Sequence, residues 1–131
     1  MIYRSKSEKD TFNIAKEYAS TLKKGDIVFL SGDLGAGKTA FVKGVASYFN
    51  IQGVVSPTYA YLNVYDNLIY HYDFYRISCY EDALMLGLTD YFGGDNICLI
   101  EWPENIKDGF IRDYKIVEIK KISAKEREII L

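Results

Sequence analysis

The sequence predicts an α/β fold in which helices cover both faces of a mixed central sheet, giving three layers. The first observation is a short apolar stretch, 27–31, that runs through a glycine-rich loop into a segment with helical spacing, 40–49. The second is another apolar stretch, 96–101, which is typical of a buried strand. The third is a set of tyrosine-rich and late β-prone segments, which add antiparallel strands. A chain of 131 residues, 49% of them hydrophobic, suits one such domain.

The N-terminal part of the chain predicts a helix followed by a strand–loop–helix unit. The segment 7–10 fits a capping box, which places the start of the helix there. Basic residues and a glycine at 23–25 supply the stop signal. The strand–loop–helix unit then ends near Asn50. The apolar residues of the first helix recur on one face: Phe12, Ala15, Ala19 and Leu22.

The rest of the chain predicts a hairpin, a short helix and three strands. Residues 59–65 and 68–75 are β-prone and are separated by Asp66-Asn67, which favours an antiparallel hairpin with a short turn. A short helix is expected over 81–86, with Gly87 closing it. The strand 96–101 should lie beside the strand 27–31 in the centre of the sheet, because it is uniformly apolar. Two late strands complete the sheet, at 114–119 and 128–131.

The loop after the first apolar strand, Gly32 to Thr39, matches the phosphate-binding pattern G-x-x-x-x-G-K-[ST]. Its glycines let the backbone curl so that several amide N–H groups converge on phosphate oxygens, and the helix N-terminus adds a favourable dipole. Lys38 can then reach the β- and γ-phosphates, and the Thr39 hydroxyl can bind Mg²⁺. The sequence therefore predicts a P-loop NTPase-like domain over residues 1–131 that binds a nucleoside triphosphate.

Two carboxylates end apolar strands and are candidates for the metal and for the attacking water. Hydrolysis at a P-loop needs such a group, and the carboxyl ends of the strands face the bound phosphates. Asp73 ends the stretch 68–73, and Glu101 ends the stretch 97–101. The residues alone leave open which of the two serves the metal.

Further residues near these strands allow more than one interpretation. Thr58, in Ser56-Pro57-Thr58, could sense the γ-phosphate or Mg²⁺ as switch loops do, although Ser-Pro is also a common strand-entry turn. Arg76 could neutralise transition-state charge, contact a partner or pair with an acid. His71 alternates with aromatic neighbours, which favours a structural role. Trp102 could pack over a nucleotide or cap the core.

Charge, cysteine and hydropathy patterns exclude several classes of protein. Sixteen Lys and Arg against eighteen Asp and Glu give a net charge of -2, which disfavours broad nonspecific nucleic-acid binding. Cys79 and Cys98 form no C-x-x-C pair, so neither zinc nor redox chemistry is indicated. No apolar run approaches the length of a membrane span. We therefore expect a cytoplasmic protein without a membrane partner.

Taken together, the motifs resemble one family over almost the whole chain. After the phosphate loop come Ser56-Pro57-Thr58-Tyr59, the run 71–76, Leu86-Gly87 and the run 101–104, in the order seen in the TsaE (YjeE) family. The resemblance implies an ATPase of tRNA threonylcarbamoyladenosine (t6A) biosynthesis that uses ATP and Mg²⁺. It also implies a TsaB–TsaD-type heterodimer as partner. That heterodimer carries out the threonylcarbamoyl transfer, tRNA is reached only through the complex, and ATP turnover resets the assembly.

The resemblance also assigns roles to single residues. It makes Thr39 and Glu101 the Mg²⁺ site and makes Lys38, Asp73 and Thr58 the catalytic candidates. The expected triphosphate cradle consists of Lys38 and of loop positions whose amides face the phosphates: Gly35, Ala36, Gly37, Thr39 and Ala40. The expected neighbours of the nucleoside are Trp102 and, for the base, Glu8, Thr11 and Arg127.

Three other functions agree with parts of the sequence. A small GTPase is suggested by Thr58, 90–93 and 123–125, but the guanine-reading N-K-x-D is missing, since 105–108 has its lysine misplaced by one position. A small-molecule kinase would need an arginine-bearing lid, and no insertion is long enough for one. A nucleotide-gated binding module with incidental hydrolysis stays open, because no arginine finger or glutamine is obvious.

Overall fold

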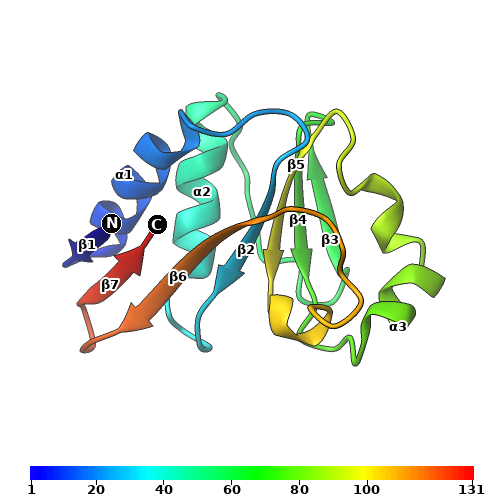
Figure 1. The fold of residues 1–131 in the computed structure, drawn as a ribbon. Coiled ribbons are helices and arrows are strands. Elements are labelled where there is room, and N and C mark those ends of the chain that lie inside the picture. The colour runs from blue at the N-terminus through cyan, green and yellow to red at the C-terminus, as the bar shows by residue number, and fades with distance from the viewer.

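One seven-stranded mixed sheet forms the centre of the molecule, as the computed structural model of residues 1–131 shows (Figure 1). The strand order is β1-β7-β6-β2-β5-β4-β3. The strands are β1 (Ile2–Ser5), β2 (Ile27–Ser31), β3 (Leu62–Tyr65), β4 (Ile69–Asp73), β5 (Ile97–Glu101), β6 (Lys115–Lys121) and β7 (Arg127–Ile130). The helices are α1 (Glu8–Ala19), α2 (Lys38–Tyr48) and α3 (Tyr80–Met85), with 3₁₀ turns η1 (Leu88–Tyr91) and η2 (Pro103–Asn105).

The four central strands of the sheet run parallel to one another, and the strands outside them pair in antiparallel fashion. β2 lies between β6 and β5, and β4 lies on the other side of β5, all in parallel pairs. β1 pairs with β7, β7 with β6 and β3 with β4 in antiparallel fashion. The expected place of the second apolar strand beside the first is therefore confirmed. The pairing sets Asp73 opposite Glu101, so two strands deliver carboxylates to the same edge of the sheet.

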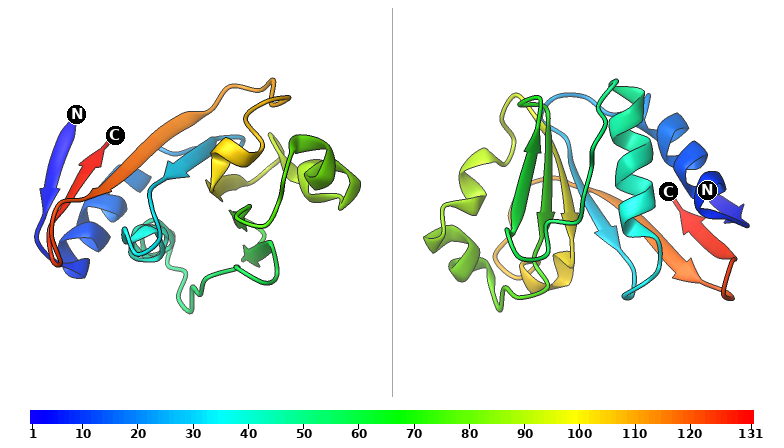
Figure 2. Two further views of the ribbon diagram at one scale, coloured as in Figure 1. Left: turned by 90° about the horizontal axis from the view of Figure 1, so that it is seen from below. Right: turned by 180° about the vertical axis from the view of Figure 1, so that it is seen from behind.

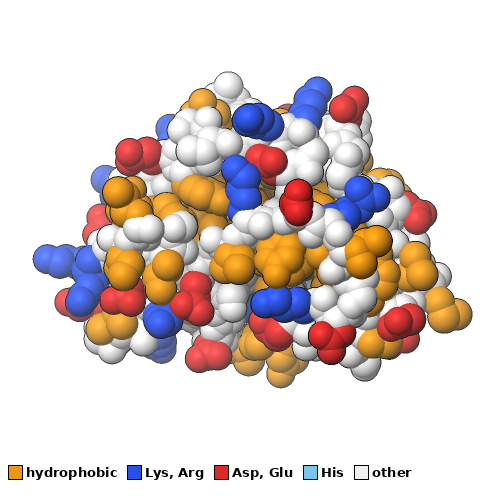
Figure 3. All heavy atoms as spheres, viewed as in Figure 1, with side chains coloured by type: hydrophobic (Ala, Val, Ile, Leu, Met, Phe, Trp, Pro, Cys, Tyr) orange, Lys and Arg blue, Asp and Glu red, His pale blue; other side chains and the backbone are white.

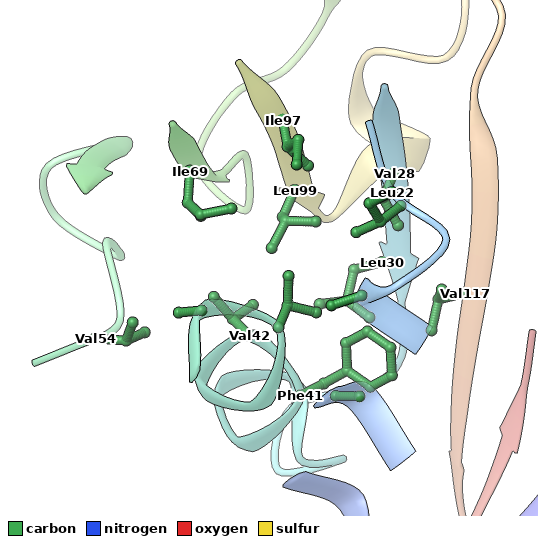
Figure 4. Packing of buried hydrophobic residues seen from close by; sticks show 14 of the residues in the cluster. Leu22, Val28, Leu30, Phe41, Val42, Val54, Ile69, Ile97, Leu99 and Val117 are labelled. Carbon is green, nitrogen blue, oxygen red and sulfur yellow. The ribbon is translucent and has the colours of Figure 1, made fainter. Parts of the chain in front are cut away.

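Helices cover both faces of the sheet, which confirms the three-layer prediction. α1 and α2 lie together over one face, as the view from behind in Figure 2 shows. α2 and the strands bury an aliphatic core that includes Leu30, Val42 and Leu99 (Figure 4). These side chains come from alternate positions of β2 and β5 and from one side of α2. The core therefore fixes α2, and with it the loop that precedes α2, against the carboxyl ends of the central strands.

The opposite face of the sheet carries aromatic side chains. Tyr72, Phe74 and Phe92 are buried there together with Ala83 of α3. On the surface of this side, hydrophobic side chains spread across the middle of the view and charged groups surround them (Figure 3). The two faces thus differ in chemistry although the same strands build both.

A close contact between α1 and α2 holds the helix layer together. A Cβ added to Gly44 of α2 would lie 2.3 Å from the carbonyl oxygen of Phe12 in α1, so only glycine allows this approach. The capping prediction for α1 is confirmed, since Ser7 Oγ accepts the amide N–H of Asp10 at 3.0 Å. The Asp10 carboxylate in turn accepts the amide N–H of Lys6 at 2.9 Å, one residue before the cap.

Several boundaries differ from the sequence-based expectation. α1 ends at Ala19, because the hydroxyls of Ser20 and Thr21 bond back to carbonyls of the last turn and begin a turn there. β1 has no counterpart among the expected elements, since it is a four-residue edge strand. The hairpin is shorter than expected, with β3 beginning at Leu62. Its turn contains Asp66 and Asn67 as expected, with φ of 53° and 52°, and the amide of Leu68 donates to the carbonyl of Tyr65 to close it.

None of the helices is both long and apolar enough to span a bilayer.

Candidate functional site

The loop between β2 and α2 depends on its glycines for conformation and for space. Gly35 and Gly37 have φ of 76° and 102°, values that favour glycine. A Cβ on Gly32 would lie 2.8 Å from the carbonyl oxygen of Ile119 in β6, so the start of the loop passes too close to the sheet for any side chain. The backbone therefore requires glycine at the two positions that the pattern fixes, Gly32 and Gly37, and favours it also at Gly35, which the pattern leaves open.

Arg127 of β7 fastens the same loop to the C-terminal hairpin. Its Nε donates to the carbonyl of Ala36 at 2.9 Å, and Nη2 donates to the carbonyl of Gly35 at 3.1 Å. Its Nη1 donates to the carbonyl of Ser123 at 2.8 Å. One guanidinium thus ties loop carbonyls to a turn more than eighty residues later in the chain. The sequence did not indicate this contact with the phosphate loop, and the contact of Arg127 with a base stays a prediction.

Lys38 is the cation at the centre of the site. Only 6% of it is exposed, and its Nζ donates to the carbonyl of Gly32 at 2.6 Å. The ammonium lies 4.0 Å from Glu101 Oε1 and 4.0 Å from the centre of the Trp102 ring. Burial lowers the pKa of Lys38, and the nearby carboxylates Glu101, Asp73, Glu104 and Asp33 partly oppose this.

The two candidate carboxylates are buried side by side. Asp73 and Glu101 are cross-strand partners and are 4% and 5% exposed. Asp73 Oδ1 accepts the amide N–H of Tyr75 at 2.9 Å. Glu101 Oε2 lies 2.5 Å from Nε2 of His71, which is fully buried. Both acids therefore keep fixed positions beside Lys38.

The segment that carries Thr58 is fastened to β3. Tyr65 Oη accepts the amide N–H of Val55 at 3.0 Å, which holds the segment where it leaves the helix layer. Thr58 is half-buried, and its hydroxyl lies 2.6 Å from that of Ser56. Arg76 stacks over the ring of Tyr59, with the guanidinium carbon 4.3 Å from the ring centre. This aromatic contact is not one of the three roles that the sequence analysis considered for Arg76.

Trp102 occupies a strained backbone position directly after β5. Its φ of 57° is unusual for a residue other than glycine, and such strain is concentrated at functional sites. Its ring packs on Tyr75, with ring centres 4.9 Å apart, and on the Lys38 ammonium. The indole thus contacts the lysine of the phosphate loop and at the same time packs against the buried cluster of the aromatic face.

Most of the predicted site residues line one cavity of about 280 Å³ at the carboxyl ends of β2, β4 and β5. Leu34 and Ser56 line it as well, and the sequence analysis did not select them as site residues. The predicted residues on its wall are Glu8, Gly35, Gly37, Lys38, Thr39, Ala40, Thr58, Asp73, Glu101 and Trp102.

A second cavity of about 480 Å³ adjoins the first, since Glu8, Gly35, Gly37 and Ala40 line both. It also contains the remaining residues expected near the base, Thr11 and Arg127, together with four that the sequence analysis did not select: Lys6, Ser7, Ala124 and Lys125.

Two predicted residues are less open than their expected roles suggest. Thr11 is 2% exposed, and its hydroxyl lies 2.7 Å from that of Ser5, so it belongs as much to the packing of α1 on β1 as to the cavity wall. Ala36 is buried and lines neither cavity, and its carbonyl is bound by Arg127. Its expected part in the cradle concerns its amide, and this amide donates to the carbonyl of Asp33 at 3.1 Å within the loop.

The family model for the threonylcarbamoyl adenosine biosynthesis protein TsaE matches residues 5–129 of this chain. The chain belongs to the TsaE family. The Bacillus subtilis tRNA threonylcarbamoyladenosine biosynthesis protein TsaE is 38% identical over 131 residues, covering 97% of this chain and 82% of the relative. The Rickettsia typhi TsaE is 46% identical over 106 residues, covering 77% of this chain and 73% of the relative. The family predicted from the order of the motifs is therefore confirmed.

The TsaE fold is likewise confirmed. The crystal structure of Bacillus subtilis YdiB superposes with a TM-score of 0.82 at 37% identity, covering 98% of this chain and 82% of that one. Membership of TsaE places the chain among the proteins of tRNA threonylcarbamoyladenosine biosynthesis.

Two kinds of site residue escaped the sequence analysis. His71 was assigned a structural role, and a signal was present: it stands two residues before Asp73 and therefore on the same face of β4. The second kind, Ala124 and Lys125 in the turn before β7, reaches the loop only through the pairing of β7 with β6. The sequence analysis considered this segment only as part of the GTPase alternative, and no local pattern indicated that it lies beside the phosphate loop.

Proposed function

We propose that this chain binds ATP with Mg²⁺ and hydrolyses it in the cavity beside the phosphate loop. We further propose that this turnover serves a TsaB–TsaD-type heterodimer during t6A formation. One observation carries the proposal: Lys38, Asp73 and Glu101 converge, nearly fully buried, on the cavity that the glycine loop lines. The adjoining cavity offers space for a nucleoside on the other side of the loop.

The charges of the site support a bound polyphosphate. Lys38 is a buried cation with four carboxylates near it and donates to a backbone carbonyl. Phosphate oxygens are better partners for an ammonium than a carbonyl is, because the hydrogen bond is then assisted by charge on both sides. The loop amides and the N-terminus of α2 add donors to the same region. We expect the Lys38 ammonium to replace its hydrogen bond to the Gly32 carbonyl with hydrogen bonds to the triphosphate.

The residues present also fit a magnesium ion. Thr39 and Glu101 offer a hydroxyl and a carboxylate oxygen on the wall of one cavity, and Mg²⁺ in triphosphate sites is bound by one or two such groups together with phosphates. When bound, the ion would neutralise charge that develops on the phosphates. Glu101 Oε1 is the oxygen on the side of Lys38.

The remaining side chains have separable tasks. Asp73 would accept a hydrogen bond from the attacking water, since its Oδ1 is already oriented by the amide of Tyr75. Thr58 would contact the γ-phosphate from a segment that Tyr65 fastens at Val55. Trp102 would close the cavity above Lys38. Release of these contacts after hydrolysis is the step that we assign to resetting the partner complex.

Isothermal titration calorimetry with ATP and Mg²⁺ tests the binding step. We expect saturable binding to the parent chain and none above background for Lys38→Ala, with equal melting temperatures for both. Competition of GTP against ATP belongs in the same experiment, because Ala124 and Lys125 of the GTPase-like segment line the second cavity. Preference for GTP would replace the ATPase proposal with a GTPase.

Reconstituted t6A formation tests the coupling. The chain, the TsaB–TsaD heterodimer, tRNA and the threonylcarbamoyl donor are combined with ATP. We expect multiple turnovers with the parent chain and a single turnover with Asp73→Asn. Equal yields with the two proteins would refute the coupling to hydrolysis and favour a nucleotide-gated binding module.

A further inference from the structure

His71 lies against the carboxylate that we assign to the metal, and the proposed function gives it no task. The side chain is fully buried, and Nε2 lies 2.5 Å from Glu101 Oε2. His71 stands between Ile69 and Asp73 on one face of β4, because side chains alternate along a strand. Its cross-strand partner on β5 is Leu99, two residues before Glu101. The imidazole therefore lies where the aliphatic core meets the carboxylates.

The hydrogen-bonding inventory determines which ring nitrogen carries the proton. An ionised carboxylate only accepts hydrogen bonds, so Nε2 must be the donor. Nδ1 is buried and has no partner, and a proton there would be a buried, unsatisfied donor. Nε2 therefore carries the donated proton, and the one polar contact of the ring is with Glu101.

Packing alone does not explain an imidazole at this position. The neighbouring positions on the same face hold Ile69 and Leu99, so an aliphatic side chain would continue the core without a polar atom to satisfy. The chain instead buries a ring with one nitrogen unpartnered, which costs free energy. A function that requires the Nε2–H donor accounts for that cost.

We propose that His71 is a positioning residue that holds Glu101 Oε2 so that Oε1 stays directed to the metal position beside Lys38. A glutamate carboxyl rotates over a broad range of its last torsion, so one fixed oxygen fixes the other. Hydrogen bonds to metal-binding carboxylates orient them in this way. The proposal rests on the proposed function, because it concerns the affinity of the site for Mg²⁺ with nucleotide.

The test is a Mg²⁺ titration of the protein saturated with the non-hydrolysable analogue AMP-PNP. Trp102 is the single tryptophan of the chain and lies at the cavity, so its emission reports the titration without turnover. Calorimetry of the same titration provides a second readout. Two matched variants separate the donor from the packing: the glutamine amide of His71→Gln reaches the Nε2 position, and the shorter amide of His71→Asn does not.

We expect His71→Asn to raise the half-saturating Mg²⁺ concentration about 10- to 100-fold and His71→Gln to remain within about threefold of the parent. Tyr70→Phe, which changes the adjacent residue on the opposite face, should match the parent. Binding of AMP-PNP without Mg²⁺ should be the same in all four proteins, since Lys38 and the loop amides are unchanged. If His71→Asn fails to fold, His71→Leu serves as the variant that lacks a hydrogen-bond donor to Glu101.

Equal Mg²⁺ titrations for the parent and the variant without a donor would overturn the proposal while leaving the ATPase intact. An equal loss in His71→Gln and His71→Asn, with melting temperatures near the parent, would also overturn it, because the donor would then not restore the site. A parent chain that shows no Mg²⁺-dependent binding of AMP-PNP would instead refute the proposed function itself.

Discussion

The two faces of the sheet differ in composition although the same strands build them. Toward α1 and α2, β4 and β5 present aliphatic residues that end in Asp73 and Glu101. Toward α3, the alternate positions present residues such as Tyr72 and Ile100, which lie in an aromatic cluster. Tyr72 stands between His71 and Asp73 in the chain, yet it belongs to the other face.

This difference teaches that one strand can hold a reactive site and an independent packing surface at the same time. Since side chains alternate along a strand, a change on one face leaves the residues of the other face in place. We therefore expect substitutions on the aromatic face to reduce stability, and substitutions at the carboxyl ends on the helix face to reduce activity. Four experiments test this separation.

The largest effect is expected from Phe92→Ala on the aromatic face. Phe92 is buried and packs on Tyr72 and Phe110, with ring centres 5.3 and 5.6 Å apart. Its removal should lower the free energy of unfolding by about 3–5 kcal/mol, measured by urea denaturation. The folded variant should bind ATP as the parent does. The exposed neighbour Tyr91, replaced by alanine, serves as control and should cost far less. A loss of ATP affinity in folded Phe92→Ala would show that the faces are coupled.

The next effect is expected from Asp73→Asn on the helix face. Asparagine keeps the oxygen that accepts the amide of Tyr75, so the melting temperature should not change. ATP hydrolysis should fall by about 10²- to 10³-fold, since one transition-state contact is lost. Asp95→Asn is the matched control, because Asp95 is an exposed carboxylate just before the opposite end of β5. Hydrolysis that survives in Asp73→Asn would remove this residue from the mechanism.

A smaller effect is expected from Arg127→Lys at the antiparallel edge. Lysine cannot donate to both loop carbonyls in the fixed geometry of a guanidinium, so the loop should be less well ordered before nucleotide binds. We expect ATP affinity to fall about 10-fold in calorimetry, with little change in stability. Arg4→Lys tests the charge of the same edge, because Arg4 forms only an exposed ion pair with Glu126. An equal effect of the two changes would deny Arg127 a specific role in supporting the loop.

The smallest effect is a dependence of stability on alkaline pH that originates on the aromatic face. Burial raises the pKa of the Cys98 thiol from 9.0 to about 12. The unfolded chain then loses this proton first, so the stabilisation is complete below pH 9 and declines as pH rises toward 12. Between pH 8 and pH 9.5 the loss should be about 0.8 kcal/mol in urea denaturation. Cys98→Ala should remove most of this loss of stability at alkaline pH, and Cys79→Ala should not. If stability still declines with pH in Cys98→Ala, the decline originates from the buried tyrosines instead.

Local patterns in the sequence predicted most of the fold. The segments 27–31 and 96–101 predicted adjacent buried strands, because continuous apolar runs suit strands covered on both faces. The Asp66-Asn67 pair predicted the turn of the hairpin, because these residues tolerate positive φ. β1 was not predicted, since four residues with mixed exposure at a sheet edge carry no periodic signal.

The residues of the candidate site also divide into those that local patterns predicted and those whose contacts the sequence did not indicate. The glycine loop with Lys38 and Thr39 is contiguous in sequence, so its pattern alone predicted a phosphate site. Asp73 and Glu101 were found because each ends an apolar strand. The contacts of His71 with Glu101, and of Arg127 with the loop, join residues 30 and about 90 positions apart. Their partners are set by strand register and by β7 pairing, which local spacing does not encode.

The amino-acid sequence by itself determined the element types, the family and the phosphate-binding loop, because short-range periodicity and backbone preferences are local properties. Only the tertiary structure decided how the loop is held and which oxygen of Glu101 faces Lys38. Those outcomes depend on the register of β4 against β5 and on the pairing of β7 between β6 and β1. Such long-range pairing is selected by the burial of both faces together.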